Sequence, residues 1–232
     1  MSVLRVLAVF GIVAVAATSA HARMSWTCEE LNARWPVYHR DLKIAWPLGH
    51  FECPSSASAL VEAIALIHDV KFRGNTDGYS PGLYDWLCRT VRAIDYADES
   101  TSGAVTHYHG QSVVTLMNPF FKLPLFQRAA VLVHEARHAM YPAEPGHVTC
   151  AGGSEAGKEG HCDAEFHRTN WEGSGYSWGF VFMWHLADDT DAVLEDHDAI
   201  IRLLKWELNN RYNYVSAADR AYFQQQWHWD GH

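Results

Sequence analysis

The chain has few basic residues for its length. Its 18 lysines and arginines are outnumbered by 27 aspartates and glutamates, and the formal net charge at pH 7 is −9. Proteins that bind phosphate backbones or anionic lipid surfaces depend on clustered positive charge. The charge balance therefore argues against nucleic acids and anionic membranes as partners.

The sequence also lacks internal repeats, long low-complexity linkers and any mark of a second domain. Past residue 22 it has no apolar run long enough to cross a bilayer. The remaining chain is nevertheless long enough to bury a full core. We therefore expect residues 23–232 to form a single domain with no stable membrane span.

Residues 1–22 have the pattern of a secretory signal peptide. Arg5 supplies the positive start, residues 6–17 form a short apolar run, and Ala20-His21-Ala22 is typical of a cleavage site. An uncleaved N-terminal anchor is the alternative interpretation. We expect the mature protein to be secreted or periplasmic.

All five cysteines lie after this segment. In an exported protein, cysteines are interpreted first as disulfide partners. Cys150 and Cys162 close a short loop and are the favoured pair. A second bridge is expected between two of Cys28, Cys53 and Cys88, which leaves one thiol over.

The apolar periodicity predicts a mostly helical α+β fold. Two segments on either side of Gly110, residues 104–109 and 112–117, are typical of a β-hairpin. This small antiparallel sheet precedes a helix that ends before Pro142, and Thr190 is expected to cap a later helix. Helices are predicted over 55–70, 81–96, 125–141, 175–187, 190–209 and 216–226.

One predicted helix contains the segment VLVHEARHAM at 131–140. His134 and His138 are one helical turn apart, so both rings point the same way and can reach one metal ion. Glu135 lies about 100° further round the helix. That is where a general base must lie to take a proton from a metal-bound water.

The alternative is that these residues are only the polar stripe of an amphipathic helix. Ala130 and Val131 lie within the same arc, so the helix is apolar nearly all round and we expect it to be buried. A buried polar group without a partner costs about 1–3 kcal/mol. The pattern therefore favours a metal site over a solvated stripe.

The HEARH segment is an instance of H-E-x-x-H, the signature of the zincin metallopeptidases. Residues 104–180 resemble small exported bacterial zincin-like proteins, with Gly146-His147, Cys150 and Cys162-Asp163 following the motif. The resemblance implies a zincin-like single domain with a disulfide-stapled loop after the active-site helix. It also implies a zinc cofactor bound by His134 and His138, Glu135 as the catalytic base, and the preceding strand as a substrate-binding edge.

A catalytic zinc usually takes three protein ligands and keeps a fourth position for water. The chain departs from the metzincin pattern, because Tyr141 replaces the required glycine and Glu144 the last histidine. His147 is the preferred third ligand, since the proline and glycine residues at 142, 145 and 146 can turn the chain back towards the helix. The alternative third ligands are Asp163, Glu144, Glu165 and Glu172.

Other residues are weaker candidates for the site. Tyr176 and Tyr141 are candidate donors to a developing oxyanion. His161 and His167 are either substrate-binding or ordinary loop residues, and His107 and His109 are more typical of a solvent-facing strand than of a second metal site. Four aromatic residues are expected to lie in the hydrophobic core and not in a substrate pocket, namely Trp178, Phe180, Phe182 and Trp184.

These observations predict an exported zinc-dependent hydrolase, a metallopeptidase whose partner is a peptide or protein substrate. Glu135 would assist the attack of zinc-bound water on a peptide or related amide bond. The alternative is a catalytically inactive zincin-like protein of the cell envelope that binds zinc or serves as an interaction module. A third interpretation is a disulfide-stapled envelope protein without metal.

Overall fold

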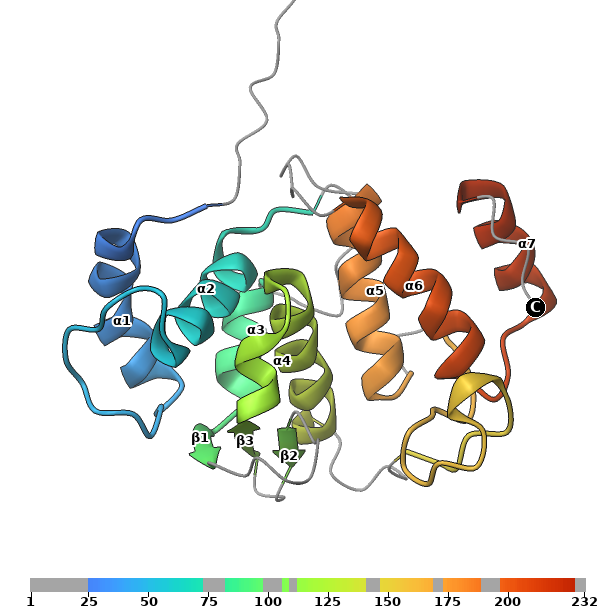
Figure 1. Ribbon diagram of the computed structural model, residues 1–232, viewed down its shortest axis with the longest axis horizontal. Coiled ribbons are helices and arrows are strands. Elements are labelled where there is room, and N and C mark those ends of the chain that lie inside the picture. The colour runs from blue at the N-terminus through green and yellow to red at the C-terminus, as the bar shows by residue number, and fades with distance from the viewer. Residues whose placement is uncertain are drawn as a thin grey trace, which may run out of the picture.

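A computed structural model describes residues 25–72, 82–97, 106–108, 112–140, 147–168, 173–188 and 197–227, with the backbone alone at 106–108. The mostly helical α+β fold is confirmed (Figure 1). The helices are α1 Cys28–Asp41, α2 Ser56–Asp69, α3 Leu83–Thr90, α4 Leu125–Met140, α5 Gly175–Asp188, α6 His197–Asn210 and α7 Ala217–Trp227. The strands are β1 Ala93–Ala97, β2 Thr106–Tyr108 and β3 Val113–Met117, and two short 3-10 helices cover η2 Asn118–Lys122 and η3 Gly153–Glu155.

Helix α4 lies in the middle of the structure. It packs along α5 on one side and against α2 and α3 on the other (Figure 1). Helix α2 is itself largely interior: nine of its 14 residues are buried, and Ser55 caps it by accepting a hydrogen bond from the amide of Ser58. Because α4 has neighbours on both sides, three of its polar residues are buried, namely Arg128, Glu135 and Arg137.

The sheet is mixed and not purely antiparallel as expected. Strands β2 and β3 pair antiparallel, as the predicted hairpin requires, although Gly110 at its turn lies outside the described residues. Strand β1 adds to the other side of β3 in parallel, which gives the order β1-β3-β2. The sheet still precedes the motif helix, with η2 between them.

The helix predicted over 81–96 is wrong in its second half. Helix α3 ends at Thr90, and the chain continues as β1 from Ala93. Val91 and Ile94 fit the apolar face of a helix, but short apolar segments fit a strand equally well. Pairing of all five residues of β1 with β3 decides the conformation.

An unexpected helix, α1, occupies the N-terminal part of the described chain. Thr27 and Glu30 form a capping box at its start, and Pro36 lies inside it. Its first residue, Cys28, forms a disulfide with Cys53, while Cys88 is the free thiol. The second bridge and the leftover cysteine, which the sequence left open, are thereby assigned.

The remaining predictions concern the chain ends and later helices. Helices α5 and α7 occupy the predicted segments, α6 begins at His197, and Thr190 lies outside the described residues. In the described part of the chain, no helix combines the length and apolarity that a bilayer span requires. The signal-peptide prediction for 1–22 also concerns residues outside that part.

Candidate metal centre

Helix α4 carries the motif on a buried surface. Glu135 is 6% exposed and Arg137 is 1% exposed, so this face is not a solvated polar stripe. The Arg137 guanidinium lies over the ring of Trp178, and its Nε donates to the carbonyl of Gly173, just before α5. Arg137 thus ties the middle of the motif to the segment that leads into α5.

Three imidazoles meet beside this helix. Nε2 of His138 lies 3.1 Å from Nε2 of His134 and 3.0 Å from Nε2 of His147, and the third side of the triangle is also 3.0 Å. Among the described residues, these three form the group of metal-ligating side chains close enough together to hold one ion. We call them the histidine cluster.

The cluster cannot be satisfied by hydrogen bonds alone. Each of its three facing nitrogens either carries a proton or presents a lone pair, so at least two of them are in the same state. Two lone pairs, or two N–H groups, repel each other at 3.0–3.1 Å. A cation held by all three nitrogens removes this conflict, and zinc–nitrogen bonds of about 2.0–2.1 Å are compatible with such a triangle.

Asp163 orients His147 and does not belong to the cluster itself. Its Oδ1 lies 2.9 Å from Nδ1 of His147, and its Oδ2 accepts from the backbone amide and hydroxyl of Ser177 in the first turn of α5. A carboxylate at Nδ1 holds the proton there and leaves the Nε2 lone pair for a metal. Asp163 is only 2% exposed, so water does not weaken this arrangement.

Gly175, the first residue of α5, lies against the cluster. A methyl group on its Cα would lie 2.7 Å from Nε2 of His138 and 2.8 Å from Nε2 of His134. Any side chain here would collide with both rings and occupy the space next to their lone pairs. The absence of a side chain at Gly175 keeps the centre of the cluster open.

The electrostatics keep two of the histidines neutral. Burial, with help from the neighbouring imidazoles, lowers the pKa of His134 well below its ordinary value, and Arg211 lowers it further. Burial likewise lowers the pKa of His138 to about 4. Neutral imidazoles are the form that binds metals.

Tyr176 packs beside the cluster, and Arg211 packs on Tyr176. The centroid of the Tyr176 ring lies 4.4 Å from the ring centroid of His147 and 4.7 Å from that of His134. The Arg211 guanidinium lies 4.9 Å from the same tyrosine ring. Burial raises the pKa of Tyr176 to about 12, so its hydroxyl stays a proton donor at neutral pH.

Glu135 lies directly beside the cluster. Its Oε1 is 4.0 Å from Nε2 of His134. The carboxylate is therefore next to the position that a ligand of a bound ion would take, without being one of the three clustered donors. Such a carboxylate is a candidate general base.

Several sequence candidates lie elsewhere. Glu165 is exposed and faces His167 at 4.0 Å, and His161 pairs with Glu155 at 3.2 Å. The predicted aromatic core is confirmed for Trp178, Phe180 and Phe182, which are buried, whereas Trp184 is partly exposed. Other candidates lie outside the described residues or on the strand described by its backbone alone: Tyr141, Glu144 and Glu172, His109 and His107.

Sequence reasoning missed Gly175 and Arg211. Neither has a local motif, because Gly175 reaches the cluster through packing of α5 against α4, and Arg211, which follows α6, through packing of α6 against α5. Comparison with models of known families, with curated proteins and with solved structures found no match to this chain. The chemistry of the site is therefore argued from its own residues.

Proposed function

We propose that this protein is an exported zinc-dependent hydrolase that cleaves peptide or closely related amide bonds. The observation that carries the proposal is the carboxylate of Glu135, buried and 4.0 Å from a histidine nitrogen of a three-imidazole cluster. Asp163 already orients a ligand through a hydrogen bond to His147, whereas Glu135 lies beside the nitrogen of His134 that faces the cluster, where it can act on a bound water. The zincin resemblance of HEARH supports the same reaction class.

Zinc is the ion that best fits the donors. The cluster offers three imidazole nitrogens, a set that zinc uses in catalytic sites with a fourth position for water or substrate. The carboxylate behind His147 is typical of such sites. Structural zinc sites instead close all four positions with protein ligands.

The residues around the cluster have distinct roles in the proposed reaction. A bound zinc ion would supply Lewis acidity, polarising the scissile carbonyl and lowering the pKa of a water molecule to about 7. Glu135 would accept a proton from the attacking water and deliver it to the leaving nitrogen. Tyr176, whose hydroxyl keeps its proton, donates a hydrogen bond to the developing oxyanion.

The sheet supports a peptide as substrate. Strand β2 ends the order β1-β3-β2 in the described chain, runs antiparallel to β3 and contacts α4. An extended peptide can pair with such an edge through backbone hydrogen bonds. This would lay a substrate backbone alongside the motif helix.

Export rests on the two disulfides and the signal-peptide pattern. The Cys28–Cys53 and Cys150–Cys162 bridges are typical of proteins from oxidising compartments. We therefore assign the protein to the periplasm or the extracellular space.

The test is Glu135→Gln in the mature protein, with Glu165→Gln as a matched control at an exposed glutamate. Wild-type and control proteins should bind one zinc and cleave members of a diverse peptide library, as followed by mass spectrometry. Glu135→Gln should bind one zinc and cleave nothing. Cleavage by that variant contradicts the mechanism, and zinc binding by the wild type without any cleavage supports the non-catalytic alternative.

A further inference from the structure

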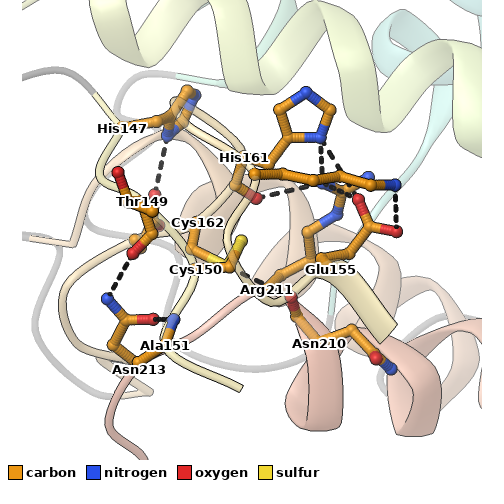
Figure 2. The surroundings of a disulfide bond; sticks show 12 residues. His147, Thr149, Cys150, Ala151, Glu155, His161, Cys162, Asn210, Arg211 and Asn213 are labelled. Carbon is orange, nitrogen blue, oxygen red and sulfur yellow. Dashed lines mark hydrogen bonds and ion pairs between the residues drawn. A yellow bond between two sulfur atoms is a disulfide. The ribbon is translucent and has the colours of Figure 1, made fainter. Parts of the chain in front are cut away.

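A buried disulfide joins the segment that carries His147, the third histidine of the cluster, to the segment that carries Asp163, the carboxylate that orients it. Cys150 and Cys162 are 3% and 1% exposed and close a loop with a sequence separation of 12. His147 lies three residues before the first cysteine, and Asp163 directly follows the second. Figure 2 shows this bridge, with His147 and Thr149 on one strand of the loop and Cys162 on the other.

The two strands of the loop are held in one register. Val148 donates to the carbonyl of Cys162 at 2.6 Å and accepts from its amide at 3.1 Å. His147 and Asp163 lie next to this hydrogen-bonded pair on opposite strands of the loop. Nδ1 of His147 is therefore 2.9 Å from Oδ1 of Asp163. A slip or separation of the strands would break the contact that orients the imidazole.

The Asp163 strand is fixed to the body of the protein. The amide of Asp163 donates to the carbonyl of Arg211, its carbonyl accepts from the amide of Asn213, and its side chain is held by Ser177. These bonds join it to the end of α6 and the start of α5. The carboxylate position therefore does not depend on the disulfide.

Apart from the Val148–Cys162 pairing, the segment that carries His147 has weaker attachments to the rest of the protein. Asn213 accepts from the amide of Ala151 and donates to the carbonyl of Thr149, but both bonds are exposed to water (Figure 2). Exposed hydrogen bonds exchange readily with hydrogen bonds to water, so each adds little to the stability of this attachment. The covalent tie between the two strands is the Cys150–Cys162 bridge.

We propose that Cys150 and Cys162 are positioning residues for the metal centre, so that tight metal binding requires their oxidation. The two thiols lose two protons and two electrons to a disulfide oxidant, which is reduced to two thiols. Only then is His147 held against Asp163 with its Nε2 facing the other imidazoles. This couples completion of the site to arrival in an oxidising compartment. The inference rests on the metal site of the proposed function and not on hydrolysis.

The chain contains a matched control in its second disulfide. The double variant Cys150→Ser/Cys162→Ser is compared with Cys28→Ser/Cys53→Ser, each as mature protein, by zinc titration against a competing chelator. The first should bind zinc about 10–100-fold more weakly, as expected when an orienting contact is lost. The second should stay within about threefold of wild type.

Thermal unfolding separates positioning from general stability. The Cys28–Cys53 bridge spans 25 residues and the Cys150–Cys162 bridge 12, so loop entropy predicts at least as large a destabilisation from loss of the former. Loss of zinc affinity only in Cys150→Ser/Cys162→Ser therefore supports positioning. Equal affinities in the two variants, or equal losses, overturn it.

A second measurement applies if Cys150→Ser/Cys162→Ser does not fold. In Cys28→Ser/Cys53→Ser, the remaining disulfide is reduced with a phosphine while far-UV circular dichroism monitors the helices and the visible spectrum monitors bound Co²⁺. The three-imidazole Co²⁺ spectrum should be lost with the helices intact and return after addition of oxidised glutathione. An unchanged spectrum after reduction overturns the inference. If peptides are not cleaved but zinc binding follows the disulfide, the proposed function fails and this inference stands.

Discussion

Oδ1 of Asp163 lies 2.9 Å from Nδ1 of His147, and the same carboxylate accepts two hydrogen bonds from Ser177 at the start of α5. One buried acid therefore connects a histidine in a loop to a helix that packs along the motif helix. Through this connection, the position of Nε2 of His147 is fixed by α5 as well as by the loop that carries the histidine.

Replacing this acid should weaken metal binding. In Asp163→Asn, the amide no longer holds the proton on Nδ1 by charge, so His147 loses its preferred tautomer and orientation. Zinc affinity should fall about 10–100-fold, measured by competition with a chelator. Asp198→Asn, at a carboxylate whose side chain is 90% exposed, is the control and should bind as wild type does. Unchanged affinity in Asp163→Asn would show that the carboxylate does not orient the ligand.

A methyl group at Gly175 should abolish stoichiometric zinc binding. It would lie 2.7–2.9 Å from ring atoms of His138 and His134 and would fill the centre of the cluster. The readout is metal content by elemental analysis of the folded variant Gly175→Ala. Gly49→Ala, where a methyl group meets no atom within 4 Å, is the matched control. Full zinc content in Gly175→Ala would place the ion elsewhere.

Zinc should stabilise the folded protein, because the cluster is assembled only by folding. At a free zinc concentration about 100-fold above Kd, the gain is about 2.7 kcal/mol. This corresponds to a rise in Tm of roughly 5–10 °C for a chain of this size, measured by scanning calorimetry with and without a chelator. His138→Ala should remove the shift and His161→Ala, outside the cluster, should keep it. A Tm that is the same with and without the chelator would support the interpretation that the protein binds no metal.

Tyr176→Phe should separate catalysis from metal binding. Loss of one oxyanion donor typically lowers kcat about 100–1000-fold, while the phenylalanine ring still packs against His134 and His147. Cleavage of a peptide hit from the library and zinc stoichiometry are measured on the same preparation. Because burial raises the pKa of Tyr176 to about 12, its contribution should persist up to about pH 10. Full activity in Tyr176→Phe would exclude this role.

Glu207 on α6 should make stability depend on pH. Its Oε2 is buried and has no hydrogen-bond partner among the described residues, and burial raises its pKa from 4.5 to about 8. Between these values the folded protein holds a proton that the unfolded chain has released. The free energy of unfolding therefore falls as pH rises through this range and levels off above it.

The neutral variant Glu207→Gln removes this dependence. Relative to wild type, the metal-free variant should gain more stability at pH 9 than at pH 5 in urea unfolding. Glu159→Gln, at an exposed glutamate, should show the same small difference at both values. A difference between wild type and Glu207→Gln that does not change with pH would show that Glu207 is not protonated in the fold.

The sequence by itself determined what depends on neighbours along the chain. Helical periodicity puts His134 and His138 one turn apart, and the apolar residues around them predict that α4 is buried. The short spacing of Cys150 and Cys162 predicts their bridge, and Ser55 marks the start of α2. These features follow from the fixed geometry of a helix turn or a short loop.

Only the tertiary structure decided what joins distant segments. Packing of α5 against α4 brings Gly175 to the cluster, and the end of α6 brings Arg211 to Tyr176. Pairing with β3 makes residues 93–97 a strand although their pattern also suits a helix. The sequence favoured His147 as the third ligand but left Asp163 open as an alternative. That choice depends on which atom faces the other two imidazoles, and it is fixed by long-range packing and backbone pairing, which no local pattern encodes.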